Sequence, residues 1–398
     1  MQLERQEFLV QIRDILYGDM EFSDNESCLI NSYSFNRLRK IKQLAFAEYI
    51  FPSATHNRYT HSLGVATVVS QMFDSVNAKN KGYLTEEDRN LLRMMGLVHD
   101  LGHSPYSHSS IALSEITHED RLPDILNLEG NNIRLENNLG VDSKDLITQT
   151  YLGEGYLYYS SDKLMLLHEF LDSFLDADKL DYLRRDSYMC GLSYGNFEFN
   201  DLIKSLTLIP SKSGVYHLGI TPEGVHALEG FVLARYYMFS KVYLEPMSCL
   251  YDMLYLREVR KYLPKGIMPD DIRKFLTWDD TRLVGKLSFL DDAGFELVYD
   301  QDFNEEAMQV IDSRFGSYLL KDVVSKAVYR KDENDAQLFV KDEALGRVVP
   351  VTEVSPLLKN MEFHRLHRLR YYAPTSIASD LRENIKVVLK GAFRYEGY

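Results

Sequence analysis

Histidines gather in one stretch of the 398-residue chain and mark it as a place where chemistry could occur. Six of the eleven histidines fall between residues 56 and 118, namely His56, His61, His99, His103, His108 and His118. Three of these lie within the run His99-Asp100-Leu101-Gly102-His103-Ser104-Pro105-Tyr106-Ser107-His108. A lone histidine is usually a core or surface residue, but six of them beside an aspartate favour a metal or catalytic site.

Imidazole and carboxylate ligands together suit a divalent transition metal such as Mn, Fe, Co, Ni or Zn. His99 and Asp100 fall at an expected helix end, where consecutive side chains diverge by about 100° and can reach one ion. His61 could supply a third ligand. Asp178, in the charged run 176–186, could supply a fourth. Asp178, Tyr182 and the pair Arg185-Asp186 share one side of the expected helix, so one end could hold metal and the other substrate hydroxyls. A charged run taken alone is more often a solvated helix face.

Longer blocks carry a resemblance to a known family. The set His61, His99-Asp100 and Asp178 resembles the signature of the HD phosphohydrolase superfamily. Four blocks in order, residues 37–44, 51–65, 99–108 and 176–186, resemble the HD-domain deoxynucleoside triphosphate triphosphohydrolases. The resemblance covers roughly residues 10–265.

The resemblance implies roles for individual residues. It implies four metal ligands, His61, His99, Asp100 and Asp178. Further residues of the active site would be His103, His108, His118 and Glu119. The triphosphate would be contacted by Arg58, Lys179, Tyr182 and Arg235, and the deoxyribose by Gln43, Leu44, Asp186 and Tyr243.

The reaction that follows is hydrolysis of a deoxynucleoside triphosphate to a deoxynucleoside and inorganic triphosphate. Metal-bound water would attack the α-phosphate, because a bound divalent ion lowers the pKa of its water and polarises the phosphoryl oxygen. His108 would protonate the leaving 5′ oxygen, oriented by His118 or Glu119. A second ion, Mg²⁺, could bridge phosphate oxygens.

Three positions depart from the regulated members of the family. Asn31 and Asn36 stand where those members carry an Asp and a Gln that bind an activating guanine nucleotide, although Arg39 is kept. Glu245 replaces a histidine after Val242-Tyr243. Nucleotide activation of the familiar kind is therefore doubtful.

Composition narrows the classes of protein. A hydrophobic content of 45% is enough for a buried core and excludes wholesale disorder. A net charge of -14 argues against a nonspecific nucleic-acid binder, which depends on many Lys and Arg contacts to phosphate. Cys28, Cys190 and Cys249 form no metal-binding pair, and no apolar signal or membrane-spanning stretch is evident. We expect a cytoplasmic protein that forms a homodimer or homotetramer, as the family does.

The fold class expected is mainly α, with an HD-domain helical core and a C-terminal α+β appendage that carries a small antiparallel sheet. Helical patterns cover residues 36–47, 61–76, 85–102, 163–189 and 222–262, whereas residues 1–30 look irregular apart from a turn at Tyr17-Gly18. Strands are expected at 325–330, 336–341 and 346–351. We predict a catalytic domain over residues 1–265 and an appended domain over 266–398.

Two further features have more than one interpretation. The basic run 364–370 could contact a nucleotide, a nucleic acid or a neighbouring subunit, but a helix face balanced by Glu353 and Glu362 is favoured. The cluster Tyr151, Tyr156, Tyr158 and Tyr159 favours a packing loop over a base-stacking surface.

Two alternative functions remain open. One is an HD phosphatase or phosphodiesterase that acts on another nucleotide, which would not need the set Arg58, Lys179 and Arg235. The other is a non-catalytic nucleotide sensor, which is disfavoured because all four metal ligands are present.

Overall fold

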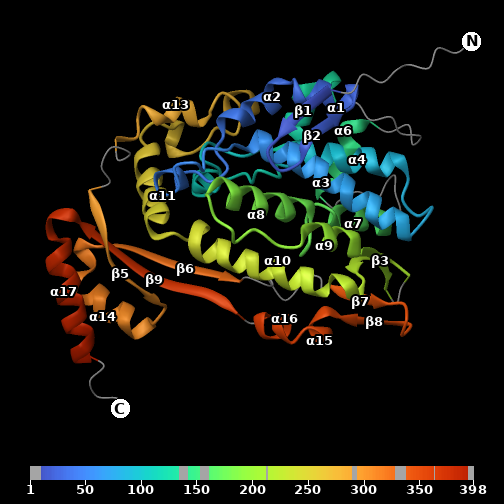
Figure 1. The fold of residues 1–398 in the computed structure, drawn as a ribbon. Coiled ribbons are helices and arrows are strands. Elements are labelled where there is room, and N and C mark those ends of the chain that lie inside the picture. Colours follow the sequence, from blue (N-terminus) through green and yellow to red (C-terminus); the bar gives the residue numbers. More distant parts are fainter. Residues whose placement is uncertain are drawn as a thin grey trace, which may run out of the picture.

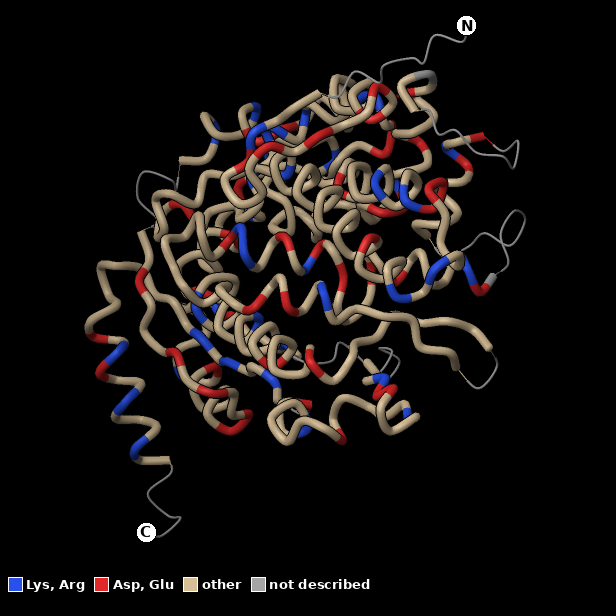
Figure 2. Tube along the Cα trace, turned by 45° about the vertical axis from the view of Figure 1, so that its right-hand side comes forward, with Lys and Arg blue, Asp and Glu red and all other residues tan. Residues whose placement is uncertain are grey.

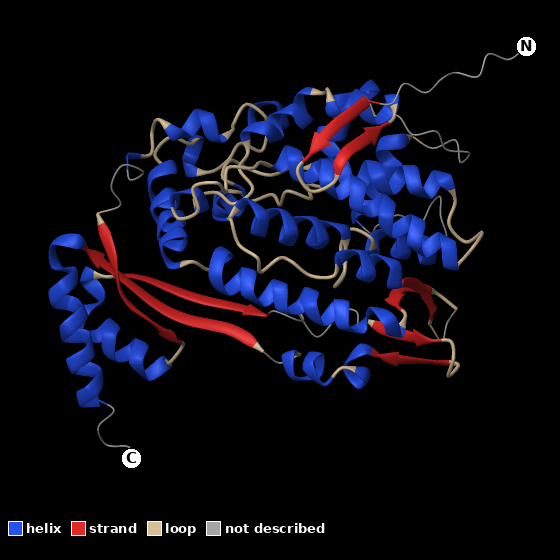
Figure 3. Ribbon diagram, viewed as in Figure 1, coloured by secondary structure: helices blue, strands red, loops and turns tan. Residues whose placement is uncertain are grey.

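A computed structural model describes residues 10–133, 142–152, 161–211, 214–288, 294–327, 338–362 and 364–392. The fold is mainly helical, with small sheets, as the sequence predicts (Figure 3). The α-helices up to residue 265 are α1 (Asp24–Ile30), α2 (Tyr33–Arg37), α3 (Arg58–Lys79), α4 (Glu86–Val98), α5 (Leu122–Glu129), α6 (Ser143–Leu152), α7 (Ser161–Glu169), α8 (Ala177–Met189), α9 (Phe199–Ser205), α10 (Val225–Met238) and α11 (Pro246–Val259).

Beyond residue 265 the structure mixes short helices with strands. The helices there are α12 (Ile272–Phe275), α13 (Asp280–Val284), α14 (Glu305–Phe315), α15 (Val351–Val354), α16 (Pro356–Met361) and α17 (Thr375–Ala392). The strands of the chain are β1 (Val10–Asp14), β2 (Gly18–Phe22), β3 (Leu206–Pro210), β4 (Tyr216–Ile220), β5 (Phe295–Asp302), β6 (Leu320–Ala327), β7 (Phe339–Asp342), β8 (Arg347–Pro350) and β9 (Arg365–Pro374).

Helices α3, α4 and α8 form the centre of the helical body (Figure 1). The apolar residues of α3 that the sequence places at three- and four-residue steps are buried, among them Val65, Val68, Met72 and Val76. Thr85 and Asp88 form the expected capping box at the start of α4. Burial of α3 between α4 and α8 fixes the helix that carries His61.

Helix α4 ends at Val98, so the expectation that it runs to Gly102 is wrong. Gly102 serves a close approach instead, because a Cβ there would lie 2.0 Å from the carbonyl oxygen of His118. This glycine lets the loop that carries His118 pack against the turn after His99-Asp100.

The prediction that residues 1–30 are irregular is wrong from residue 10 onward. Strands β1 and β2 form an antiparallel hairpin in which Asp14 pairs with Gly18, and helix α1 follows. The turn at Tyr17-Gly18 is confirmed, with Gly18 at φ +71°. Ser23 and Glu26 make a capping box that starts α1.

The predicted helix over residues 36–47 is also wrong. Helix α2 ends at Arg37, a 3₁₀ turn covers Leu38–Lys40, and another covers Ala47–Tyr49. The backbone between these turns bonds to a distant segment, because Gln43 N–H donates to the His56 carbonyl and Arg58 N–H donates to the Ile41 carbonyl. These long-range bonds replace those that a helix would make.

The predicted helix over residues 163–189 is two helices, α7 and α8. Asp176 interrupts it, since its side chain accepts from the backbone N–H of Lys179 as the N-cap of α8. The helical pattern over 222–262, which is compatible with one helix or two, is confirmed as two helices, α10 and α11, joined by a π-helical turn at Phe239–Tyr243.

The three predicted C-terminal strands do not share one antiparallel sheet. Strand β6 joins a sheet of order β5-β9-β6, while β7 and β8 join a sheet of order β3-β4-β7-β8 in which β4 and β7 are parallel. The predicted positions 328–330 and 336–337 lie outside the described residues.

The basic run 364–370 lies largely in β9 rather than on a helix, which corrects that interpretation. Antiparallel register sets Arg368 opposite Asp302 and Arg370 opposite both Asp300 and Asp322. Arg368 lies 2.8 Å from Asp300 and 2.9 Å from Asp302, so cross-strand carboxylates neutralise it. Figure 2 shows basic and acidic positions interspersed along the described chain, with red beside blue in this sheet.

Two hydrophobic clusters hold the described residues together. The larger runs from Met20 to Tyr372 and includes Phe275 and Trp278 of the segment after residue 265. The smaller lies between the β5-β9-β6 sheet and helices α14 and α17, which stand apart from the helical body (Figure 1). The domain division at residue 265 stays a prediction. Among the described helices, none has the length and apolar composition to span a bilayer.

Candidate functional site

Three helices bring a cluster of metal-ligating atoms together. His61 comes from the first turns of α3, His99 follows the end of α4, and Asp178 lies in the first turn of α8. His61 Nε2 lies 2.9 Å from Asp178 Oδ1 and 3.3 Å from His99 Nε2. One ligand atom from each residue falls within 4.8 Å of the others. Both histidines are buried and Asp178 is about a third exposed (32%), so the cluster is open on the Asp178 side.

Asp100, the fourth predicted ligand, lies beside this cluster. Its Oδ1 is 3.4 Å from His99 Nε2 and its Oδ2 is 3.7 Å from His61 Nε2. The far nitrogens of both rings are already occupied, His99 Nδ1 by the Gly96 carbonyl at 2.8 Å and His61 Nδ1 by Asp181 at 2.8 Å. Each ring therefore turns Nε2 toward the other ligands, as metal-binding histidines do.

The electrostatics of the cluster suit a cation. Burial lowers the pKa of His61, but hydrogen bonds to Asp178 and Asp181 outweigh it and raise the pKa to about 10. Two carboxylates therefore hold a proton on His61 in the metal-free chain. Burial raises the pKa of Asp178, but the hydrogen bond and charge of His61 lower it by more, so the net pKa is below its ordinary value. A donor set of two imidazoles and two carboxylates around a place that already attracts positive charge fits a divalent transition metal.

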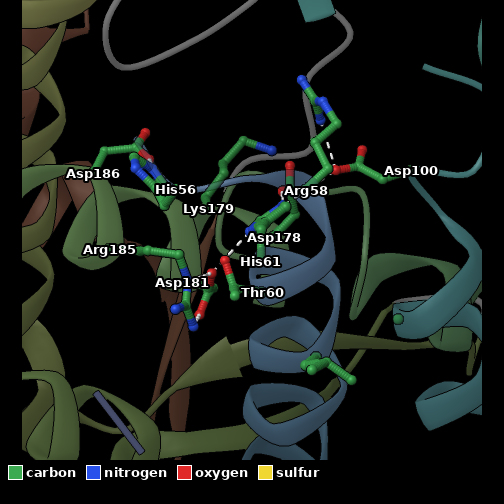
Figure 4. Close-up of polar contacts among 12 residues, drawn as sticks. His56, Arg58, Thr60, His61, Asp100, Asp178, Lys179, Asp181, Arg185 and Asp186 are labelled. Atoms are coloured by element: carbon green, nitrogen blue, oxygen red, sulfur yellow. Dashed lines mark hydrogen bonds and ion pairs between the residues drawn. The ribbon is translucent and has the colours of Figure 1, made fainter. Parts of the chain in front are cut away.

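Asp181 is a functional candidate that the sequence analysis missed. Its carboxylate is fully buried and contacts His61 Nδ1 on the side away from Asp178 (Figure 4). The spacing of three residues from Asp178 on the same helix was the signal that could have found it. Arg185, expected on the face with Asp178, instead pairs with Asp181 and Asp14 in the interior.

The second group of predicted catalytic residues lies next to Asp100. His103 Nε2 is 3.3 Å from Asp100 Oδ1, and the His103 ring stacks on His118 with centroids 4.0 Å apart. His108 meets His103 edge-on at 5.1 Å, and His118 Nδ1 is 3.0 Å from Glu119. The structure thus brings His103, His108, His118 and Glu119 into one cluster.

Three residues of this cluster, His103, His108 and Glu119, have pKa values below their usual range. Burial, with the nearby charges of Arg58 and His118, lowers the pKa of His108 to about 4. Burial, Arg58 and His118 also hold the pKa of His103 well below its usual range. Burial raises the pKa of Glu119, but its hydrogen bond to His118 outweighs that and lowers the pKa to about 2. The rings of His103 and His108 are therefore neutral at pH 7 in the chain alone.

The predicted triphosphate contacts flank both clusters. Arg58 donates from Nη1 to Asp100 at 2.6 Å and from Nε to the Ser107 hydroxyl at 2.7 Å. Lys179 pairs with Asp176, and the charges of Arg235 and Lys179 both act on the Tyr182 hydroxyl. Arg235 is buried, and its Nε has no hydrogen-bond partner among the described residues.

The predicted sugar contacts lie on another side of His61. Asp186 accepts from the Tyr243 hydroxyl at 2.8 Å and lies 2.7 Å from His56 Nε2, a partner the sequence analysis missed. Figure 4 shows the His56–Asp186 pair and the Arg58–Asp100 pair on opposite sides of His61. The Tyr182 and Tyr243 rings meet edge-on at 6.0 Å.

Gln43 and Leu44 stand in the segment that bonds to the backbone of His56. Gln43 has a buried Oε1 without a hydrogen-bond partner among the described residues, and Leu44 packs on the larger hydrophobic cluster. The side chain of Gln43 is thus able to accept from a ligand.

The three departures from the regulated pattern have local structural roles. Asn31 is the C-cap of α1. Asn36 donates to the carbonyls of Ile30 and Ser32. Glu245 caps α11 by accepting from Ser248 N–H at 2.7 Å, which explains a carboxylate at that position.

Of the tyrosine cluster, Tyr151 packs against the larger hydrophobic cluster and donates to the His99 carbonyl at 3.4 Å. Tyr156, Tyr158 and Tyr159 lie outside the described residues.

Comparison with known proteins agrees with this geometry. Residues 58–148 match the family model of the HD domain, which includes His61, His99 and Asp100. An uncharacterized protein of Methanocaldococcus jannaschii, MJ1154, is 28% identical over 94% of this chain and 81% of its own length. The human deoxynucleoside triphosphate triphosphohydrolase SAMHD1 is 30% identical over 48% of this chain, which covers only 35% of the human protein.

A solved structure supports the fold over almost the whole length. A hypothetical protein of Aquifex aeolicus superimposes with a TM-score of 0.76 at 26% identity, covering 95% of this chain and all of that chain. The chain spans half of the length of another relative, the uncharacterized protein YwfO of Bacillus subtilis. The HD-domain match and the similarity to SAMHD1, rather than these two uncharacterized proteins, bear out the resemblance to HD-domain triphosphohydrolases.

Proposed function

We propose that this chain, whose HD domain relates it to the deoxynucleoside triphosphate triphosphohydrolases, hydrolyses deoxynucleoside triphosphates to a deoxynucleoside and inorganic triphosphate. The observation that carries the proposal is the meeting of His61, His99 and Asp178 beside Asp100. Arg58 and a second histidine cluster lie on one side of these ligands, and Asp186 with Tyr243 on another. This arrangement suits a substrate whose phosphates lie on the Arg58 side and whose sugar hydroxyl lies on the Asp186 side.

His61, His99, Asp100 and Asp178 would hold a divalent ion, with Mn, Fe, Co, Ni and Zn as the candidates, and a second Mg²⁺ would accompany the substrate. When bound, such an ion supplies activated water and polarises a phosphoryl oxygen. Asp178 is the ligand nearest to solvent, so substrate would approach from its side.

Arg58 would release Asp100 to the ion and turn its guanidinium to the phosphates. Its cationic hydrogen bonds then stabilise negative charge that develops on the phosphate oxygens. Arg235 and Lys179 would neutralise the rest of the triphosphate near Tyr182. An unpartnered buried Nε on Arg235 supports this role, because a buried donor gains most from a new acceptor.

His108 would give a proton to the leaving 5′ oxygen. The pKa of His108 in the chain alone is lowered by burial and by the nearby Arg58 and His118. A bound polyanion would offset the Arg58 charge and raise the pKa of His108 toward about 7. His118, fixed by Glu119 at 3.0 Å and by stacking on His103, would hold the neighbouring ring in place.

Asp186 would accept from the 3′-hydroxyl of a deoxyribose. His56 and Tyr243 hold the carboxylate from two sides, which limits its rotation and fixes the direction of its free lone pairs. Gln43 Oε1, Leu44 and the Tyr182 and Tyr243 rings would complete the sugar pocket.

A product assay tests the proposal. The purified chain is incubated with each dNTP and NTP and with Mn²⁺, Co²⁺, Ni²⁺, Zn²⁺ or Mg²⁺, and the phosphate products are resolved by ion-exchange chromatography. We expect tripolyphosphate from at least one dNTP. Release of pyrophosphate or orthophosphate alone would favour the phosphatase or phosphodiesterase alternative, and nucleotide binding without turnover would favour a sensor.

A matched pair of variants assigns the activity to the site. Asp178→Ala should lose both metal and activity, whereas Asp172→Ala, six residues earlier with a 71% exposed side chain, should keep both. Light scattering on the same samples tests whether the chain is a dimer or tetramer, which we also propose.

A further inference from the structure

A chain of buried ion pairs connects the N-terminal hairpin to His61. Asp14, at the end of β1, lies 2.7 Å from Nη1 of Arg185. Arg185 donates from Nε and Nη2 to the two oxygens of Asp181, at 2.8 and 2.9 Å. Asp181 Oδ2 in turn lies 2.8 Å from His61 Nδ1 (Figure 4).

These charged side chains are shielded from solvent, so their ion-pair partners determine their positions. Asp181 is 0% exposed, Arg185 is 2% exposed and Asp14 is 8% exposed. A buried charge is tolerated only where it is paired and hydrogen-bonded, and removing one partner leaves the other uncompensated. One guanidinium balances two carboxylates here, which makes each carboxylate depend on the other through Arg185.

A glycine in α3 leaves room for the ion pairs between Asp181 and Arg185. Gly64 lies one turn after His61, and a Cβ at that position would be 2.1 Å from Asp181 Oδ1 and 2.5 Å from Arg185 Nη2. A glycine at this point of a buried helix costs helix propensity. The close approach of Asp181 and Arg185 to the helix explains why it is there.

Asp14 also shapes the hairpin turn. Its Oδ1 accepts from the backbone N–H of Leu16 at 2.8 Å and of Tyr17 at 3.2 Å. The Arg185 guanidinium lies 5.8 Å from the centre of the Tyr17 ring. The turn and the buried arginine therefore share one carboxylate, so the position of the hairpin and the position of Arg185 are linked.

We propose that Asp14, Arg185 and Asp181 are positioning residues, which hold the His61 ring with Nδ1 protonated and Nε2 turned to the metal, so that the hairpin β1–β2 sets the metal affinity. All three lie outside residues 58–148, the part of the chain that matches the HD domain. The inference rests on the proposed function only in taking His61 as a metal ligand.

Asp14→Asn tests the link with the smallest change of shape. The new side chain keeps an oxygen for the turn and loses the charge that pairs with Arg185. Substitution of a residue that hydrogen-bonds to a metal ligand typically weakens metal binding by roughly 10–100-fold. We therefore expect Asp181→Asn to weaken Mn²⁺ binding, measured by calorimetry, by about 10–100-fold, and Asp14→Asn by about 3–10-fold because it acts through one more residue.

The control is Asp19→Asn in the same hairpin, since Asp19 pairs with Arg13 on the surface with side chains 53% and 77% exposed. It should bind Mn²⁺ as the wild type does. If Asp14→Asn weakens binding no more than Asp19→Asn, the inference is overturned. Failure of the wild type to bind Mn²⁺, Co²⁺ or Zn²⁺ would instead overturn the metal site of the proposed function.

A measurement on the wild type covers the case in which Asp14→Asn does not fold. Histidine is labelled with ¹⁵N in the Zn²⁺-loaded chain, and the His61 signals are assigned by comparison with His61→Gln. We expect Nδ1 to carry a proton and Nε2 to bind zinc. Zinc bound to Nδ1 would show that Asp181 does not orient the ring, and the inference would be wrong.

Discussion

Nη1 of Arg58 donates a 2.6 Å hydrogen bond to Oδ2 of Asp100, and both side chains are buried. Burial raises the pKa of Asp100, but the Arg58 charge and the adjacent histidines outweigh it and hold the pKa well below its usual range. A residue that we assign to the phosphates thus holds a residue that we assign to the metal. Arg58 could therefore act on the phosphates directly or act on the metal through Asp100.

Arg58→Gln should lower triphosphate release while leaving metal affinity equal to or above that of the wild type. The charge that stabilises phosphate oxygens is lost, which typically costs about 10²–10³-fold in kcat. Asp100 meanwhile loses a cation that competes with the metal. Steady-state product analysis and Mn²⁺ calorimetry measure the two effects.

Arg89→Gln is the control, because Arg89 pairs with Asp74 near the surface, where its side chain is 28% exposed. A large loss of metal affinity in Arg58→Gln would mean that Arg58 mainly positions Asp100.

Tyr243→Phe should lower kcat/KM for a dNTP by roughly 10–100-fold, because a hydrogen bond to a charged group contributes about 1.5–3 kcal/mol. The lost hydroxyl is the one that donates to Asp186 at 2.8 Å. Tyr237→Phe, on the neighbouring helix α10 with 40% exposure, should leave kcat/KM unchanged. Equal kcat/KM values for the two variants would show that Tyr243 does not contribute to the sugar pocket.

Gly64→Ala should destabilise the chain by about 1–3 kcal/mol, the usual range for overpacking a buried site. The added methyl would fall 2.1 Å from Asp181 Oδ1, and neither Asp181 nor Arg185 can move without losing a buried partner. Gly285→Ala is the control, since nothing lies within 4 Å of a Cβ there and φ is -71°. Urea unfolding of both variants measures the difference, and equal stability would show that the ion-pair chain can shift.

Asp252→Asn should gain stability over the wild type as pH rises. Burial and the nearby charge of Asp322 raise the pKa of Asp252, the Ser109 hydrogen bond partly opposes them, and the net pKa is about 7. The folded chain therefore binds this proton more tightly than the unfolded chain, in which an Asp titrates near 3.9, at about pH 4. The resulting stabilisation is full below about pH 4 and is lost as pH rises through about 7.

Asn cannot titrate, so the Tm of Asp252→Asn minus the Tm of the wild type should increase from pH 5 to pH 8. Thermal unfolding at both values measures it, with Asp172→Asn as the exposed control. A difference that stays constant with pH would show that Asp252 is ionised throughout.

The sequence by itself predicted the residues that we propose carry the chemistry. His61, His99-Asp100 and Asp178 were identified from residue type, order and resemblance, and α3 and the capping box of α4 from local periodicity. Such features depend on neighbours three or four residues apart, so the chain encodes them locally.

Only the tertiary structure decided which partners these residues have. Asp181 reaches His61 across 120 positions, Arg185 reaches Asp14 across 171, and Asp186 lies between His56 and Tyr243. The segment of strand β9 was wrongly predicted as a helix face for the same reason, because Arg368 and Arg370 are neutralised by aspartates 66 to 70 positions away. A buried charge is set by whichever opposite charge the fold brings within about 3 Å, and spacing along the chain does not specify that distance.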